Sequence, residues 1–280
     1  WRQKNRDYVL AMSLDVAKVL FEIEHLFYEY NLEEIDMKNA ANPVNMLQFI
    51  TQPAFLVKDG IIIQTNKAAK EAKLFGNVNI CCSSKETKYD HIPAFDTWNL
   101  TDNAAYLHIT SNNTVAGTQY RVFPKVDKNV PMIADMSSDI MSRVINVNDF
   151  GMIYAGAQKN LGPSGFALVI IRKDLMERVA ATVPTMLKYT TYAENGSMFN
   201  TPPCYAIYIA GLTFKWIKKM GGLEKMKEIN EKKAKILYDF LDNSKLFKGT
   251  VVPEDRSLMN VPFVTGDEEL DALFVKEAKE

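Results

Sequence analysis

The first 65 residues combine one helical pattern with short apolar runs. Residues 5–31 place apolar side chains at the spacing of one helix face and charged side chains on much of the opposite face, which predicts an amphipathic helix. An Asn-Pro-Val-Asn stretch at 42–45 interrupts the chain, and Met46–Ile50 is then expected to form a short helix. Ala54–Val57 and Ile61–Gln64 stand on either side of an Asp-Gly turn signal, which predicts a β-hairpin.

From about Asn66 the pattern changes to short apolar strands that alternate with helices and loops. Several strands are apolar on both faces, as expected where helices cover both sides of a sheet. The expected strands are Val78–Cys82, Tyr106–Thr110, Met132–Ala134, Met152–Ala155, Phe166–Ile171 and Met259–Val264. The expected helices are Pro203–Lys219, Leu223–Leu241 and Asp267–Lys279, with Gly221-Gly222 between the first two. This alternation predicts an α/β fold.

Composition and charge exclude few functions. Apolar residues make up 47% and charged residues 24%, which is ordinary for a soluble globular protein. The 33 basic and 34 acidic side chains nearly cancel, so bulk charge gives no argument for a nucleic-acid or membrane partner. No apolar run reaches the roughly 18 residues of a membrane helix, and no signal peptide is visible. Because Trp1 is an unusual first residue, we expect a segment upstream of it to be missing.

The cysteines and histidines predict neither a disulfide framework nor a metal site. Three cysteines, two of them adjacent, are too few for a framework, which favours a reduced, cytoplasmic compartment. His25, His91 and His108 are isolated, and none has metal-ligand spacing to another histidine, cysteine or acid. The chain also lacks the glycine-rich patterns that hold dinucleotides and nucleoside triphosphates.

The sharpest chemical feature is the segment Tyr154–Gly165, which begins at the end of an expected strand and continues into a loop of small residues. Lys159 lies among Gly, Ala and Ser, which leave room for a flat ligand close to the backbone. A partly desolvated lysine loses its proton more readily and becomes a nucleophilic amine. On composition alone, however, a turn with an exposed lysine is the simpler interpretation.

Two other expected strands also end in polar residues. Asp135 follows Ile133 and Ala134, and a carboxylate in that place can face the crevice where α/β sheets bind ligands. In pyridoxal phosphate enzymes such an acid pairs with the pyridinium nitrogen. Taken alone, Asp135 is more simply a cap for the following turn. His108–Thr114 is a similar strand that runs into small polar residues, and taken alone it is more simply an ordinary polar turn.

Together and in this order, these features resemble the phosphoserine aminotransferases, a branch of the class-V aminotransferases and of the fold-type I pyridoxal phosphate enzymes. The resemblance covers about Asn66–Glu280. Its motifs are Lys67–Ala72, Ser111–Thr114 with Gly117-Thr118, Ala134–Arg143, Tyr154–Gly165, Asn200–Pro203 and Arg256–Phe263. It implies a three-layer α/β/α large domain at 66–245 that lacks its N-terminal part, and the start of a smaller α+β domain at 246–280.

The resemblance also implies roles for matched residues. Lys159 would carry pyridoxal phosphate as a Schiff base and move a proton between the substrate carbon and the cofactor. Gln158 would help to hold the cofactor phosphate, Asp135 would pair with the pyridine nitrogen, and Thr114 would contact the region of the ring hydroxyl. No metal is implied.

The implied assembly is a homodimer, because Asn200 and Thr201 would reach the cofactor phosphate of the neighbouring subunit. The implied reaction moves an amino group between phosphoserine and 2-oxoglutarate, with glutamate as the other amino acid, in serine biosynthesis. All these partners are small molecules.

Residues 1–65 depart from the family pattern. They contain neither the His-Arg pair for substrate anions nor the Gly-Gly-Ala-Ser segment that cups the cofactor phosphate. Gln64 stands where the family has a tryptophan that stacks on the cofactor ring, and an amide cannot supply that flat apolar face. The arginines that bind the substrate phosphate and carboxylate would follow Glu280.

Two further functional hypotheses therefore remain beside the pyridoxal phosphate-dependent transaminase. Gln52–Ile61 followed by Asn66–Ala69 resembles the opening of a PAS sensor domain after a signalling helix, which would make the chain a chimeric sensor. Alternatively, the chain is an inactive fragment without transaminase activity, whose sheet exposes an unpaired edge and favours aggregation. The length of the class-V resemblance favours the transaminase.

Overall fold

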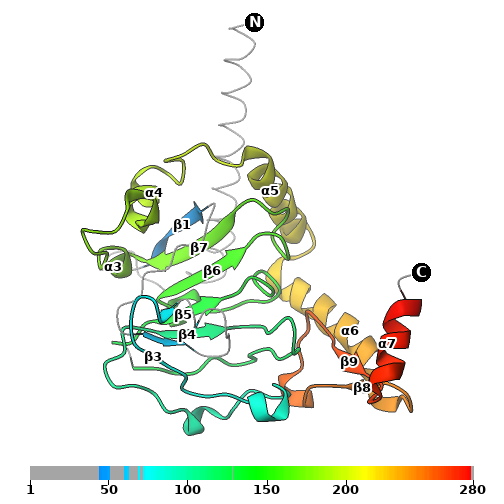
Figure 1. Cartoon of the computed structure of the whole chain (residues 1–280). Helices are drawn as coiled ribbons and strands as arrows, with labels where there is room; N and C mark the ends of the chain where they lie inside the picture. Colours follow the sequence, from blue (N-terminus) through cyan, green and yellow to red (C-terminus); the bar gives the residue numbers. More distant parts are fainter. Residues whose placement is uncertain (1–43, 51–59, 63–68, 70–71, 128, 279–280) are drawn as a thin grey trace, which may run out of the picture.

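The computed structural model describes residues 44–50, 60–62, 69, 72–127 and 129–278, and these residues form one central sheet (Figure 1). Its seven strands are β1 (Val44–Ile50), β2 (Gly60–Ile62), β3 (Val78–Asn79), β4 (Leu107–Thr110), β5 (Met132–Asp135), β6 (Met152–Gly156) and β7 (Ala167–Arg172). Their order across the sheet is β1-β7-β6-β5-β4-β2-β3.

The sheet is mostly parallel. Strands β3, β2, β4, β5 and β6 run in one direction, and β7 is antiparallel to both of its neighbours, β6 and β1. The apolar run of β7 is buried from Ala167 to Ile171, as expected for a strand covered on both faces. Because β4, β5 and β6 are parallel neighbours, their carboxyl ends lie together at one edge of the sheet.

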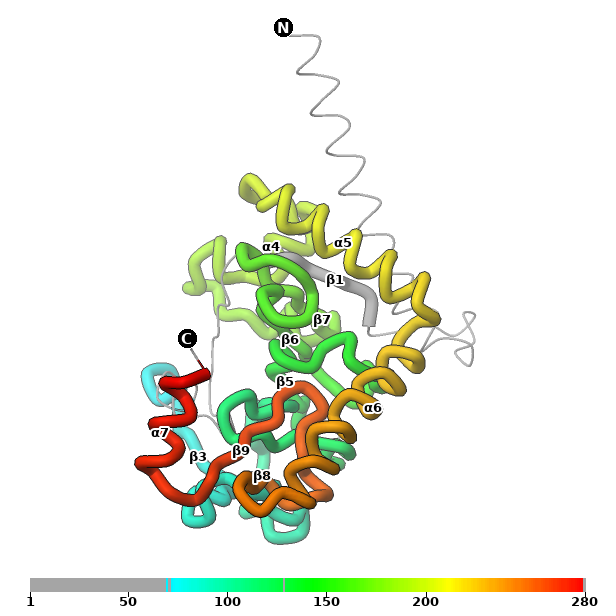
Figure 2. The backbone as a smooth tube through the Cα atoms, turned by 90° about the vertical axis from the view of Figure 1, so that its right-hand side faces the viewer, coloured from blue at the N-terminus to red at the C-terminus, as the bar shows by residue number. Residues whose placement is uncertain are grey.

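The helices whose bounds are described come after the seven strands in the sequence. They are α3 (Lys173–Met176), α4 (Tyr189–Glu194), α5 (Cys204–Lys219), α6 (Gly222–Asn243) and α7 (Glu268–Glu277), with a second small sheet of β8 (Lys248–Gly249) and β9 (Phe263–Val264). Short 3₁₀ turns occur at Lys85–Thr87, Phe95–Thr97, Val147–Asp149, Thr185–Leu187 and Pro253–Asp255. Figure 2 shows α5 and α6 in succession along the same side of the molecule.

Helix α5 covers the main core with one apolar stripe. Its buried residues are Ala206, Ile207, Ala210, Gly211, Phe214 and Ile217, which recur at the period of a helix face. Gly221 then separates α5 from α6 with a φ of +105°, a left-handed conformation that glycine adopts without a Cβ clash. Helix α6 leads away from the sheet to the corner formed by β8, β9 and α7 (Figure 1).

Most elements expected from the sequence are confirmed within one to three residues at each end, and so is the α/β class. The predicted helix start at Asp267 is also confirmed, since its side chain accepts hydrogen bonds from the backbone N–H groups of Glu269 and Leu270. Over the part of the chain that is described, every helix is too short or too polar to span a lipid bilayer.

The short helix predicted at Met46–Ile50 is wrong. These residues belong to β1, which pairs antiparallel with β7 so that Leu47 lies opposite Ile170 and Ile50 opposite Ala167. Pairing with a distant strand satisfies the backbone donors and acceptors of one edge, and this gain outweighs a weak local helix preference.

The predicted hairpin is wrong. Its second run, Ile61–Gln64, overlaps β2, which pairs in parallel with β3 on one edge and with β4 on the other, so neither edge is left for an antiparallel hairpin partner. Its first run, Ala54–Val57, lies outside the described residues, as does the helix predicted at 5–31.

Candidate functional site

Strands β4, β5 and β6 bring polar residues to one edge of the sheet. In the register of the strands, Thr110 lies opposite Asp135, and Asp135 lies opposite Tyr154. The chain leaves these three strands at Ser111, Met136 and Ala157. The segments that follow therefore start side by side, which is the usual place for a ligand in an open α/β sheet.

Lys159 lies in a tight turn just after β6. The carbonyl oxygen of Ala157 accepts hydrogen bonds from the backbone N–H groups of Leu161 and Gly162, at 3.3 and 2.9 Å. Ala157 and Leu161 are fully buried, which anchors the turn and leaves Lys159 on its exposed side. The Nζ of Lys159 donates a hydrogen bond of 2.7 Å to Oγ1 of Thr114, so the structure brings together two of the predicted site residues.

Asp135 ends β5, and its carboxylate is fixed by the following turn. Oδ1 of Asp135 accepts a hydrogen bond of 2.9 Å from the backbone N–H of Ser137. The Ser137 hydroxyl in turn accepts a bond of 3.0 Å from the N–H of Gly156 at the end of β6. Asp135 thus does cap its turn, as the simpler interpretation predicted, and the same turn fixes its carboxylate beside the lysine segment.

The buried His108 and the half-buried Tyr154 form a polar pair on the strands next to Asp135. Nε2 of His108 lies 2.9 Å from the hydroxyl of Tyr154, and both residues come from strands of the sheet. Burial lowers the pKa of His108 to about 4, against the opposing charge of Asp135, so its imidazole is neutral at pH 7. Burial also raises the pKa of Tyr154, and the charge and hydrogen bond of Asp135 add to that rise. Tyr154 therefore keeps its proton and supports the carboxylate.

The remaining predicted site residues are less directly placed. Gln158 is exposed next to Lys159, and its amide folds back over Gly156, where a Cβ would come within 2.5 Å of Oε1. Asn200 is half-buried and Thr201 is exposed, just before α5. Among the described residues, Asn200 and Thr201 make no hydrogen bond to Lys159, whose side chain bonds Thr114.

The sequence interpretation missed the support of the site. Ser137, His108 and Tyr154 had been given no role, although polar residues inside two otherwise apolar strands were a usable signal. A cluster of three or more His, Cys, Asp or Glu side chains suited to a metal ion is absent from the described ranges.

Comparison with known proteins identifies relatives of this arrangement. The sequence model of the Aminotransferase class-V family matches residues 43–279, a range that begins ahead of the motifs at Asn66. Phosphoserine aminotransferase of Lysinibacillus sphaericus is 48% identical over 238 residues, which cover 85% of this chain and 65% of that protein. The chain thus spans about 65% of the length of that curated relative.

Solved structures agree with the sequence relatives. The structure described as "Radiation damage of the Schiff base in phosphoserine aminotransferase" matches with a TM-score of 0.84 and 41% identity, over 94% of this chain and 76% of that one. The pyridoxal phosphate-bound phosphoserine aminotransferase of Trichomonas vaginalis matches with a TM-score of 0.80 and 32% identity, over 94% and 77%.

Proposed function

The chain belongs to the aminotransferase class-V family, and on that premise we propose that it is the pyridoxal phosphate-binding part of a phosphoserine aminotransferase. The proposed reaction exchanges an amino group between phosphoserine and 2-oxoglutarate, with glutamate as the other amino acid. The observation that supports it most directly is the Lys159–Thr114 contact at the carboxyl edge of the sheet, because it places an exposed primary amine beside a hydroxyl, at the edge where Asp135 ends the neighbouring strand.

The side chains at this edge suit the cofactor chemically. Pyridoxal phosphate needs an amine for covalent attachment, an acid for its pyridine nitrogen and a donor near its ring oxygen. Lys159, Asp135 and Thr114 supply these three groups, each from a different strand end. Gln158 would add an amide toward the phosphate, and Asn200 and Thr201 would serve the site of a second subunit.

Once bound, the cofactor would supply an electron sink that stabilises negative charge on the substrate carbon. Lys159 would hold the cofactor through Nζ and would take up and return the proton of the substrate carbon. Asp135, held by the N–H of Ser137, would be the acid that pairs with the pyridine nitrogen. Thr114 orients the Lys159 amine through the 2.7 Å hydrogen bond.

The partners and the compartment belong to this proposal. We infer small-molecule substrates, a homodimer with shared sites and a cytoplasmic location.

The extent of the family match favours this function over a chimeric sensor. A phosphoserine aminotransferase match from Bacillus cereus extends over 98% of this chain. The class-V match at 43–279 also takes in Gln52–Ile61, the stretch on which the sensor interpretation rests.

Adding pyridoxal phosphate to the purified chain tests the cofactor assignment. We expect a visible absorption band that borohydride traps on a single peptide containing Lys159. The variant Lys159→Ala is expected to lose both the band and the trapped peptide. Lys173→Ala, which changes an exposed lysine at the start of α3, serves as the matched control and should keep both.

Turnover tests the substrate assignment separately. When the chain with bound pyridoxal phosphate is supplied with phosphoserine and 2-oxoglutarate, we expect it to form glutamate. A coupled glutamate assay measures this product. A band that persists in Lys159→Ala would refute the assigned lysine. A lysine-dependent band without glutamate formation would leave cofactor binding intact and refute phosphoserine transamination by this chain.

A further inference from the structure

The 250–262 segment, which follows β8, lies against the loop that carries Thr114. The backbone N–H of Ser257 donates a hydrogen bond of 2.8 Å to the carbonyl oxygen of Gly117, and the N–H of Gln119 donates one of 2.9 Å to Asp255 O. Ser257 is fully buried. Residues that are about 140 positions apart in the sequence are thereby joined beside the lysine segment.

Asn260 bonds the residue that accepts the hydrogen bond from Lys159. Its Nδ2 donates hydrogen bonds to the backbone carbonyl oxygens of Thr114, at 2.9 Å, and Asn113, at 3.3 Å. Its Oδ1 accepts bonds from Nδ2 of Asn112, at 2.8 Å, and from Oγ of Ser257, at 3.1 Å. These partners fix the orientation of the amide. In a flipped side chain, Oδ1 would face the two carbonyl oxygens and Nδ2 would face the Asn112 donor.

The series of hydrogen bonds continues to the Lys159 amine. Asn260 holds the backbone of Thr114, and the side chain of Thr114 accepts the hydrogen bond from Lys159 Nζ. From these contacts we propose that Asn260 is a positioning residue, which sets the place of the Thr114 hydroxyl and thereby of the Lys159 amine toward the cofactor. This inference rests on the proposed function, since it assigns Lys159 to pyridoxal phosphate.

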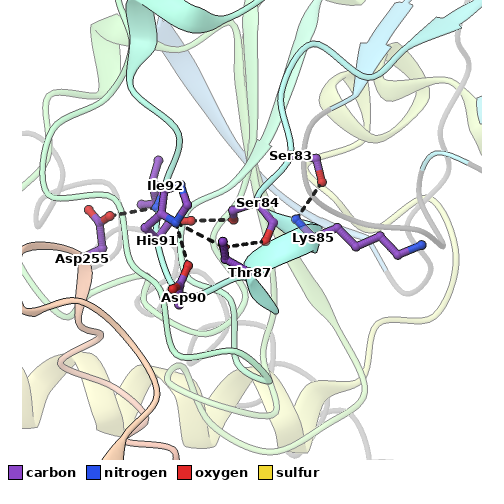
Figure 3. Close-up of polar contacts among 8 residues, drawn as sticks. All are labelled: Ser83, Ser84, Lys85, Thr87, Asp90, His91, Ile92 and Asp255. Carbon is purple, nitrogen blue, oxygen red and sulfur yellow. Dashed lines mark hydrogen bonds and ion pairs between the residues drawn. The ribbon is translucent and has the colours of Figure 1, made fainter.

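The same segment has a second attachment that provides a control. Figure 3 shows Asp255 beside the turn at residues 83–92, where its Oδ2 accepts a hydrogen bond of 2.8 Å from the N–H of Ile92. The N–H of Val252 also donates to the carbonyl oxygen of Asp90, at 3.0 Å. Asp255 and Asn260 are both half-buried, and the side chain of each bonds a distant backbone group. Of these two side chains, only that of Asn260 bonds the loop that touches Lys159, whereas Asp255 meets this loop through its backbone carbonyl.

The experiment compares Asn260→Ala and Asn260→Asp with Asp255→Ala in the purified full chain titrated with pyridoxal phosphate. In metal sites, loss of a group that orients a ligating side chain typically costs about ten- to a hundredfold in affinity, and we take the lower end as the guide here. We therefore expect both Asn260 variants to bind pyridoxal phosphate about tenfold more weakly. They should also shift the pH at which the visible band changes. Asp255→Ala should keep the wild-type pH and affinity, even where it lowers the melting temperature as much.

A measurement without cofactor separates this inference from the proposed function. Lysines are reductively methylated with ¹³C-formaldehyde and a borane reductant, and the Lys159 resonance is identified by its loss in Lys159→Arg. Asn260→Ala should move this resonance in the direction seen for Thr114→Val, whereas Asp255→Ala should leave it in place.

The possible outcomes distinguish the proposed function from the proposed role of Asn260. If wild-type chain binds no pyridoxal phosphate but the resonance moves as described, the proposed function fails and the positioning contact stands. If the chain binds pyridoxal phosphate while the Asn260 variants keep the wild-type affinity and resonance, the inference is overturned and the function stands. Equal effects of the Asp255 and Asn260 variants would also overturn it, because they would show a general loss of stability.

Discussion

At the scale of single residues, the candidate site depends on buried polar side chains that have specific partners. Asp139 is buried and accepts hydrogen bonds from Ser111 Oγ and, at 3.1 Å, from Gln119 Nε2. Burial raises its pKa, although both hydrogen bonds act in the opposite direction. In His108, by contrast, burial lowers the pKa, because the neutral form of an imidazole is the deprotonated one. Such groups make the fold sensitive to pH in different windows.

We predict that His108 weakens the fold as the pH falls from about 6.5 toward 4. An unfolded histidine binds its proton near pH 6.5, whereas the folded pKa of His108 is about 4. In this window the unfolded state binds more protons, so the free energy of unfolding falls with falling pH, by on the order of 3 kcal/mol across the window. Above pH 6.5 this contribution to stability is fully present.

Urea unfolding of His108→Gln at pH 7 and pH 4.5 measures this effect. The glutamine amide can still reach the Tyr154 hydroxyl but does not titrate, so we expect a smaller loss of stability on acidification than in the wild type. Equal losses in the wild type and in His108→Gln would contradict the prediction.

At the scale of elements, α5 shows how a sequence pattern becomes packing. Its small and apolar residues form one stripe, which packs on the core that also contains Leu161 of the lysine turn. Close approach is visible at Gly162, where an added Cβ would lie 3.4 Å from the backbone of Ala210. The helix therefore supports the turn that presents Lys159.

We predict that Phe214→Ala is strongly destabilising, because the ring of Phe214 is 0% exposed in the middle of α5. Removing a buried phenylalanine side chain costs about 3–5 kcal/mol. Tyr205→Ala, on the same helix with 73% exposure, should change stability by less than about 0.5 kcal/mol. Urea midpoints of the two variants measure the difference, and similar midpoints would show that α5 does not pack as described.

At the scale of the whole molecule, the 250–262 segment is joined to the sheet domain through the loop at 111–119. Gly117 has a φ of +89°, and an added Cβ would overlap the ring of Pro262. Gly266 has the same φ of +89° but nothing within 4 Å of an added Cβ. The two glycines thus separate backbone strain from the packing of the segment on the loop.

We predict that Gly117→Ala lowers stability more than Gly266→Ala. Both substitutions force alanine into a left-handed conformation, which costs roughly 1 kcal/mol. Gly117→Ala must also displace Pro262, which adds about 1–3 kcal/mol of overpacking. Melting temperatures measure the stability of each variant. Gly117→Ala should also weaken the binding of pyridoxal phosphate, whereas Gly266→Ala should not. Equal melting temperatures would argue against close packing of the segment on the loop.

The sequence by itself determined the α/β class, most of the strands and helices, and the residues Lys159, Asp135 and Thr114 at the ends of three strands. These features depend on side chains a few positions apart, through apolar periodicity and turn residues. They can therefore be predicted without knowledge of the fold. The family motifs added the cofactor and the reaction as expectations, because each motif is also a local pattern.

Only the tertiary structure decided the contacts between distant segments. Val44–Ile50 is a strand because β7, more than 100 residues later, offers it an edge, and no local pattern indicates that pairing. Asn260 reaches the backbone of Thr114 across 146 positions, and the His108–Tyr154 pair joins two strands 46 positions apart. Hydrogen bonds and burial depend on distance in space, and the sequence specifies that distance only through the complete fold.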